Sequence, residues 1–214
     1  MPKYYEIKSF LENYSATLVA VSKTKPAEAI EALYAAGQRD FGENYVLELV
    51  DKAASLPKDI NWHFIGHLQT NKVKYIAPFV YLIHGVDSLK LLQEINKQAL
   101  KNNRVIDCLL QIHIATEETK FGFDISEVES INWQHLAELS GVRVRGFMGM
   151  ASFTDNEAQI QREFQTLVTC FKAAQINQKD LSILSMGMSG DYALALEKGS
   201  NMVRVGSLLF GARS

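Results

Sequence analysis

A lysine at the end of an apolar run is the first residue of this chain that could do chemistry. Residues 18–26 read Leu-Val-Ala-Val-Ser-Lys-Thr-Lys-Pro, so Lys23 follows a stretch typical of a buried β-strand. Partial desolvation at such a strand end disfavours the charged ammonium and leaves an amine that can attack an aldehyde. Lys23 is therefore a candidate for a Schiff base. The alternative is that Lys23 only ends the strand and extends its amine into solvent.

Two glycine-containing segments near the C-terminus could bind a phosphate. Residues 185–191 read Ser-Met-Gly-Met-Ser-Gly-Asp, and residues 204–207 read Arg-Val-Gly-Ser. Glycine lets backbone amides approach an anion closely, and the hydroxyl group of Ser189 can donate a hydrogen bond. A helix predicted to begin near Gly190 adds the positive end of its dipole. The alternative is that Ser189 only caps this helix and that the glycines only form turns.

A lysine that binds an aldehyde, together with a phosphate site, matches the chemistry of pyridoxal 5′-phosphate. Arg204 supports this interpretation, because it has the same strand parity as Gly206 and both can face the same side. A cation beside the pyridine nitrogen discourages its protonation and makes the ring a weaker electron sink. This favours carriage of the cofactor or racemase-like chemistry over aminotransferase chemistry. The alternative is that Arg204 is a surface or salt-bridged arginine.

The elements that must position these residues alternate between strand-like and helix-like segments. We predict eight strands, at residues 17–22, 39–42, 61–66, 79–84, 105–114, 142–150, 181–185 and 201–205. The helices between them are predicted at residues 26–36, 45–54, 71–77, 88–102, 125–139, 157–175 and 190–197, after an extra N-terminal helix within residues 1–15.

Strict alternation of this kind gives parallel strands with helical crossovers, and eight such units can close on themselves. The sequence therefore predicts an α/β fold, a single (β/α)8 TIM barrel with an extra N-terminal helix, as one domain over residues 1–214. In a TIM barrel the chemistry lies at the C-terminal ends of the strands, which is where Lys23, Ser189 and Gly206 fall. An open doubly wound sheet has the same alternation and is the alternative.

The composition is that of an ordinary globular protein. Of the 214 residues, 47% are hydrophobic and 21% are charged, and the formal net charge of -2 gives no support for nucleic-acid binding. No apolar run is long enough to span a membrane, and the N-terminus does not read as a signal peptide. Cys108 and Cys170 lie in strand-like and helix-like runs, which indicates buried thiols in a reducing compartment. We expect a cytoplasmic monomer that binds neither nucleic acid nor membranes.

Several segments carry a family resemblance when they are taken together. They read Ala-Val-Ser-Lys-Thr-Lys-Pro (20–26), Phe-Gly-Glu-Asn-Tyr (41–45), Trp-His-Phe-Ile-Gly (62–66), Leu-Gln-Thr-Asn-Lys (68–72), Ser-Met-Gly-Met-Ser (185–189) and Met-Val-Arg-Val-Gly (202–206). These segments closely resemble the pyridoxal phosphate homeostasis proteins, the YggS/PROSC family, and the resemblance runs nearly end to end. One departure is His67, where some members have proline or other residues.

The resemblance implies the fold of the alanine racemase N-terminal barrel. It also implies that Lys23 carries the cofactor as an aldimine and that Arg204 lies beside the pyridine nitrogen. By the same resemblance, Ser189, Gly206 and Ser207 contact the phosphate.

The choice between Lys23 and Lys25 is less direct. Both have the same strand parity, so alternation does not separate them. Lys25 precedes Pro26, where the next helix begins, and we therefore place Lys25 outside the barrel mouth. The resemblance also favours Lys23. Lys120, in the loop at residues 116–122, is either a solvated lysine or a second amine that helps the cofactor to enter and leave.

Two further positions are open to more than one interpretation. Asn44 follows the second predicted strand and either hydrogen-bonds the cofactor or caps the next helix. His63 and His67 have the spacing of a metal-binding pair, but His67 lies beyond Gly66 and no carboxylate stands between the two histidines. We therefore assign no metal.

Two functions of different classes fit these residues. One is a protein that holds pyridoxal phosphate and delivers it to apo-enzymes, and the other is a pyridoxal-dependent amino-acid racemase. Racemisation needs an acid/base on each face of the substrate α-carbon, and alanine racemases take the second from an additional domain and a partner subunit. This chain shows no such domain, so we favour the carrier and assign no catalytic residue. A phosphosugar lyase would explain the phosphate site but not Arg204.

Overall fold

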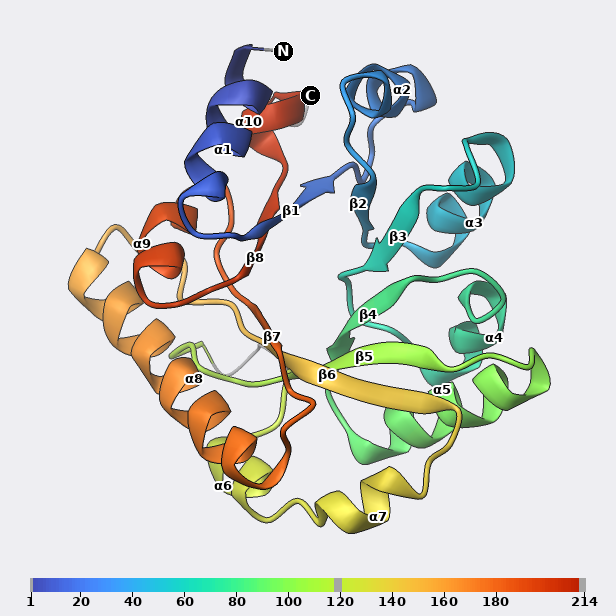
Figure 1. The fold of residues 1–214 in the computed structure, drawn as a ribbon, viewed down its shortest axis with the longest axis vertical. Coiled ribbons are helices and arrows are strands. Elements are labelled where there is room, and N and C mark those ends of the chain that lie inside the picture. Colours follow the sequence, from blue (N-terminus) through green and yellow to red (C-terminus); the bar gives the residue numbers. More distant parts are fainter. Residues whose placement is uncertain (1, 118–120, 212–214) are drawn as a thin grey trace.

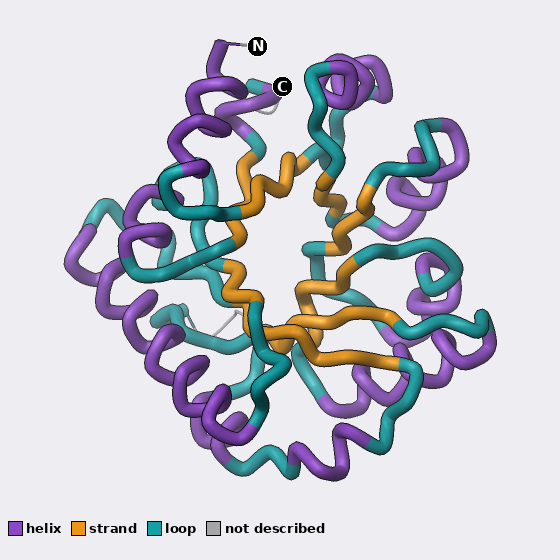
Figure 2. Tube along the Cα trace, in the orientation of Figure 1, coloured by secondary structure: helices purple, strands orange, loops and turns teal. Residues whose placement is uncertain are grey.

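The chain folds into a closed barrel of eight parallel strands. We describe residues 2–117 and 121–211 of a computed structural model. The strands follow one another around the barrel in chain order, and β8 pairs with β1 to close it (Figure 2). Their bounds are β1 (Thr17–Val21), β2 (Asp40–Glu43), β3 (Asn61–Phe64), β4 (Leu82–Val86), β5 (Ile106–Gln111), β6 (Val142–Met148), β7 (Ile183–Ser185) and β8 (Met202–Val205). The predicted TIM barrel is confirmed, and the open-sheet alternative is wrong.

The helices form an outer ring around the strands (Figure 1). They are α1 (Pro2–Glu12), α2 (Ala27–Ala35), α3 (Val46–Ser55), α4 (Val73–Ile76), α5 (Leu89–Lys101), α6 (Ile125–Glu129), α7 (Trp133–Ala137), α8 (Glu157–Asn177), α9 (Tyr192–Glu197) and α10 (Ser207–Phe210), with a short 3-10 turn at Thr70–Lys72. The extra N-terminal helix is α1. Over the described residues, no helix has both the length and the apolar character that crossing a bilayer requires.

Some predicted boundaries are wrong for identifiable reasons. The strand predicted at residues 79–84 begins later, at Leu82, because the amides of Phe79 and Val80 both bond to the carbonyl of Ile76 and close the end of α4. The helix predicted at residues 125–139 is two short helices, α6 and α7. The second starts afresh where the side chain of Asn132 accepts a hydrogen bond from the amide of His135, which is the pattern of an N-cap.

Apolar side chains fill both the space outside the strands and the inside of the barrel. Most of them pack between strands and helices, as Leu18 and Ala20 do on β1. The alternate residues point inward, where Val19, Leu82, Leu109, Met148 and Met202 form a separate cluster. Because β1 pairs with both β2 and β8, the loop after β1 lies between the loops that follow those two strands. This brings Lys23 near segments that are far from it in sequence.

Candidate functional site

A cleft of about 760 Å³ opens where the strands end. Its wall contains all of the residues predicted from the sequence, namely Lys23, Asn44, Ser189, Arg204, Gly206 and Ser207. Lys23 follows β1, Asn44 follows β2, and Ser189 and Gly206 follow β7 and β8. This is the end of a parallel barrel at which loops can vary without disturbing the strands, so it is where chemistry is expected.

A tight turn after β1 presents Lys23 to the cleft. The strand ends at Val21, and the amide of Lys25 donates to the carbonyl of Ser22 over 3.0 Å. Thr24 adopts a left-handed conformation with φ of 62° to complete the turn. The turn bends Lys25 back to the wall of the same cleft, so our placement of Lys25 outside the barrel mouth is wrong. Strand parity does not apply to either lysine, because both lie beyond the strand.

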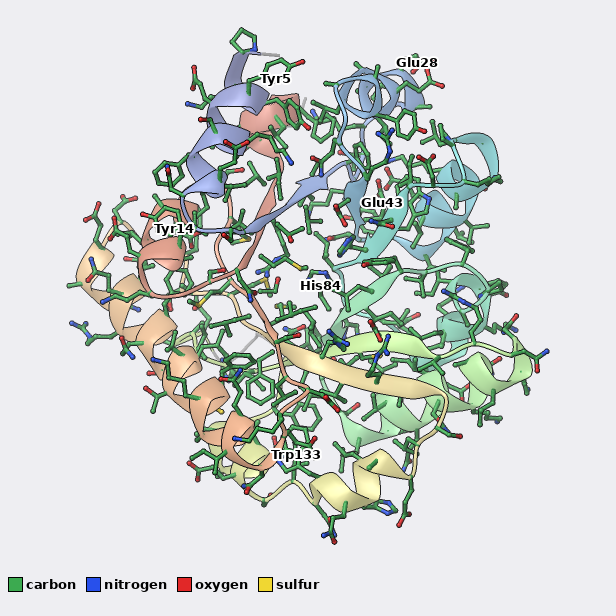
Figure 3. All side chains as sticks on the ribbon, in the orientation of Figure 1. Tyr5, Tyr14, Glu28, Glu43, His84 and Trp133 are labelled. Atoms are coloured by element: carbon green, nitrogen blue, oxygen red, sulfur yellow. The ribbon has the colours of Figure 1, made fainter. Side chains whose placement is uncertain are left out.

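A buried ion-pair network fixes both neighbours of Lys23. The ammonium of Lys52 donates to carboxylate oxygens of Glu43 at 2.7 Å and Glu48 at 2.6 Å, and to the carbonyl of Ser22 at 2.8 Å. The hydroxyl of Ser22 donates to Glu43, and the amide of Thr24 donates to Glu48, each over 2.6 Å. Burial raises the pKa of Glu43, although the hydrogen bonds from Lys52 and Ser22 act in the opposite direction. Glu43 lies at the end of β2 (Figure 3).

The segments after β7 and β8 are joined by a hydrogen bond at one end of the cleft. The amide of Gly206 donates to the hydroxyl oxygen of Ser189 over 3.2 Å. Ser189 is not a helix cap, because α9 begins at Tyr192 and has Asp191 at its N-cap position. The helix expected near Gly190 is present as α9, which is six residues long and begins two residues later than predicted.

Arg204 lies at the base of the cleft and is almost fully buried, with the residue 3% exposed. One terminal nitrogen donates to the carbonyl of Ser185 at 2.9 Å and to its hydroxyl at 2.6 Å. The other donates to the carbonyl of Gly149 over 3.0 Å. Burial lowers the pKa of Arg204 to about 10, so the group stays charged at neutral pH. The alternative of a surface arginine is wrong.

Asn44 contributes to the wall and does not cap a helix. The N-cap position of α3 is Tyr45, which makes no side-chain cap hydrogen bond. The backbone of Asn44 instead packs against Gly66, where a Cβ atom would lie 2.4 Å from the Asn44 carbonyl oxygen. Only glycine allows this approach between the loops after β2 and β3.

Sequence reasoning missed the side of the cleft that follows β3 and β5. The ring of His67 stacks on Phe121 with centroids 4.1 Å apart, and the His67 Nδ1 atom lies 3.0 Å from a carboxylate oxygen of Asp87. Gln111 donates to the Phe121 carbonyl over 2.6 Å. All four lie at or after the C-terminal ends of strands, which is the signal that could have found them. Lys120 lies outside the described residues.

His63 and His67, which have the spacing of a metal-binding pair, point to different places. His63 points into the barrel, where its Nδ1 atom is 2.9 Å from Nε2 of His84, whereas His67 lies on the cleft wall. Within residues 2–117 and 121–211 there is no group of three or more histidine, cysteine or acidic side chains that could hold a metal ion.

The fold and the cleft have clear relatives among known proteins. The family described as "Alanine racemase, N-terminal domain" matches residues 3–214. Pyridoxal phosphate homeostasis proteins of Aquifex aeolicus and Vibrio alginolyticus are each 40% identical to this chain, over 92% and 99% of it and 87% and 92% of their own lengths. This chain belongs to the pyridoxal phosphate homeostasis protein family.

Solved structures agree with this membership of the pyridoxal phosphate homeostasis protein family. PipY of Synechococcus elongatus PCC7942 is 36% identical, and the match covers 98% of this chain and 99% of PipY. The TM-score is 0.93 for PipY without PLP and 0.89 for PipY with PLP bound. The alanine racemase of Clostridium difficile 630 has a TM-score of 0.72 at 15% identity, over 96% of this chain and 56% of the racemase. That likeness shows the shared barrel fold alone.

Proposed function

We propose that this protein binds pyridoxal 5′-phosphate in the cleft and holds it through Lys23, as a carrier that takes part in homeostasis of the cofactor. The observation that carries the proposal is that one cleft is lined by Lys23, by Arg204 and by the residues Ser189, Gly206 and Ser207 from the loops after β7 and β8. The names of the relatives and the PipY structure with PLP bound support it. The volume of about 760 Å³ lies in the range of small-molecule sites.

The residues present fit the cofactor group by group. When bound, the cofactor supplies an aldehyde, a phosphate and a pyridine nitrogen. An amine can bond to the aldehyde, and the turn that carries Lys23 is held by the Glu43–Lys52 network. Ser189, Gly206 and Ser207 offer hydroxyl and backbone donors for the phosphate, and Arg204 offers a charged donor for the ring nitrogen. Asn44, which follows β2, offers a further contact from the cleft wall.

The covalent bond is tested on the purified protein. We expect a yellow protein whose visible absorbance band is lost after borohydride treatment, with a secondary amine left on Lys23. Lys23→Ala should lose the band, and Lys25→Ala, its matched control in the same cleft, should keep it. Circular dichroism shows that each variant is folded. Loss of the band in Lys25→Ala alone would assign the bond to Lys25 instead.

We infer further that the bound cofactor undergoes no turnover with amino acids. The Arg204 cation opposes protonation of the ring, which makes the ring a poor acceptor for a carbanion. The names of the relatives, homeostasis proteins, agree with this inference. A racemase is the second candidate, and the position of Lys25 favours it, because a second amine reaches the wall of the same cleft.

The setting of this function is also proposed. The thiols of Cys108 and Cys170 are both buried and unpaired, which suits a reducing cytoplasm. We propose that the single domain acts there as a monomer, and that the partners which receive the cofactor are apo-enzymes. No nucleic acid and no membrane is needed for such a transfer.

A further inference from the structure

A chain of hydrogen bonds crosses the inside of the barrel from Arg204 to Asp40. The hydroxyl of Ser185 lies 2.6 Å from a terminal nitrogen of Arg204 and 3.2 Å from Nδ1 of His84. His84 Nε2 lies 2.9 Å from His63 Nδ1, and His63 Nε2 lies 3.0 Å from a carboxylate oxygen of Asp40. Arg204 lines the cleft, whereas Asp40 opens β2 at the opposite end of the barrel. His84 is seen inside the ring of strands (Figure 3).

The polar groups of this hydrogen-bond path are buried in apolar surroundings, which costs folding free energy. The inward cluster beside it is apolar, formed by Val19, Leu82, Leu109, Met148 and Met202. Ser185, His63 and His84 are fully buried, and groups of this kind destabilise a fold unless each finds a hydrogen-bond partner. Four successive contacts supply these partners. Apolar side chains at these positions would fill the barrel without this cost, so the presence of polar ones points to a role beyond stability.

The donors and acceptors along the path can be assigned from its charged ends. A guanidinium only donates and a carboxylate only accepts, so Arg204 donates to Ser185 and His63 Nε2–H donates to Asp40. Burial lowers the pKa of His84 well below its ordinary value, with further contributions from His63 and then Arg204, so His84 is neutral at neutral pH. Because Ser185 Oγ accepts from Arg204, its own proton donates to His84 Nδ1, and His84 Nε2–H then donates to His63 Nδ1. Every bond then runs in one direction.

The other ionisable groups near this path are few in the part of the chain described here. Asp40 comes from β2, His63 from β3, His84 from β4 and Arg204 from β8. The ring of Tyr81 packs on His63 with centroids 5.4 Å apart. Asp191 acts on the charge of Arg204 from the loop after β7.

We propose that Ser185, His84, His63 and Asp40 are positioning residues for Arg204. The chain holds the guanidinium at the base of the cleft and fixes which of its donors point to the ring nitrogen of a bound cofactor. In this way the carboxylate at the far end of the barrel sets the electrostatic environment of the ring. The effect on the cofactor's pyridine ring rests on the proposed function. The positioning of Arg204 by the hydrogen-bond path does not.

The hydrogen-bond path is tested first in the protein without cofactor. Nitrogen-15 NMR of the imidazole groups should show that His63 and His84 both carry their proton on Nε2. Asp40→Ala removes the acceptor at the far end, and the tautomer ratio of His84, which does not contact Asp40, should change roughly 10-fold or more. Asp40→Asn keeps an oxygen acceptor without its charge and should cause a smaller change in the same direction. Asp59→Asn, which alters an exposed pair with Arg39, should cause none.

A His84 proton on Nδ1, or a tautomer ratio that is the same in all of these variants, would overturn the proposal. Because Asp40→Asn is the milder substitution, it decides the question if Asp40→Ala does not fold.

The link to the ring is tested with the cofactor-loaded protein. We expect the pH midpoint of the visible absorbance band to shift in Ser185→Ala and in Asp40→Asn but not in Asp59→Asn. A midpoint that stays the same in all three would overturn the link while the cofactor still binds. If the wild-type protein binds no cofactor, the proposed function is wrong, and the tautomer measurement alone decides whether the chain positions Arg204.

Discussion

At the scale of single residues, Ser189 shows how one hydroxyl group serves both the fold and the site. Its oxygen accepts the amide hydrogen of Gly206, which leaves its own proton available to a ligand in the cleft. The side chain therefore joins the two segments that we assign to the phosphate. Its contribution can be measured without disturbing Lys23.

We expect Ser189→Ala to weaken cofactor binding without preventing the bond to Lys23. A hydrogen bond to a charged phosphate contributes about 1.5 to 3 kcal/mol, which corresponds to a dissociation constant roughly 10-fold to 150-fold higher. Absorbance titration of the apoprotein measures this constant. Ser126→Ala, an exposed serine on α6, is the control. A dissociation constant unchanged from the wild type would remove Ser189 from the phosphate site.

At the scale of elements, the turn after β1 depends on charges supplied by β2 and α3. Glu43 ends β2, and Glu48 and Lys52 lie on successive turns of α3. None of these side chains is close to Lys23 in sequence, yet together they bond to the residues on either side of it. The position of Lys23 therefore depends on β1, β2 and α3 together.

We expect Lys52→Met to destabilise the fold by about 3 to 5 kcal/mol, because it leaves the carboxylate of Glu43 buried without its charge partner. Urea unfolding followed by circular dichroism measures the loss. Adding Glu43→Gln should recover a large part of it, because the double variant buries no unpaired charge. Lys3→Met, which removes an exposed pair with Glu6, should leave the urea midpoint unchanged. Equal effects of the two lysine substitutions would show that the buried network contributes nothing.

The sequence predicted the type of most elements because their hydrophobic pattern is local. The eight strands and the N-terminal helix follow from alternation, and even the misplaced strand at Leu82 is wrong only in its boundary. The candidate site residues after β1, β7 and β8, which line the cleft, could be predicted because they fall where strands end. Long-range partners were not found. Nothing in the spacing of Ser22, Glu43 and Lys52, or of His63 and His84, says that these side chains meet, because register and closure of the barrel bring them together.

At the scale of the whole molecule, the buried His84 should make the free energy of unfolding depend on pH. The pKa of His84 in the folded state lies well below the ordinary value of 6.5, so below that pH the unfolded chain binds more protons than the folded one. The free energy of unfolding should therefore fall as pH decreases from 6.5 towards the folded-state pKa, by up to about 1.4 kcal/mol per pH unit.

Chemical denaturation at a series of pH values measures this slope. His84→Gln should flatten it, whereas the same substitution at the exposed His135 should not. A slope that is the same in wild type and His84→Gln would show that the pH dependence comes from other groups.

The carrier function makes a prediction for the intact protein. Loaded with cofactor and mixed with an apo-enzyme, it should restore the activity of that enzyme, compared with an equal amount of free cofactor. Incubated with single enantiomers of amino acids, it should show no racemisation, decarboxylation or transamination, because in the proposed site Arg204 would keep the ring a poor electron sink. Repeated turnover that disappears in Lys23→Ala would support the racemase instead.

Closure of the barrel by β8 against β1 also has a kinetic consequence. This pairing joins the first strand to the last, so it closes the longest loop in the chain and is entropically the most costly contact to form early. Lys23 lies on one side of that seam, and Arg204 and Gly206 lie on the other. A half-formed barrel therefore has no cofactor site. Recovery of the yellow colour during refolding should lag behind the return of helical circular dichroism. The bound cofactor is therefore a spectroscopic probe of the step in which β8 pairs with β1.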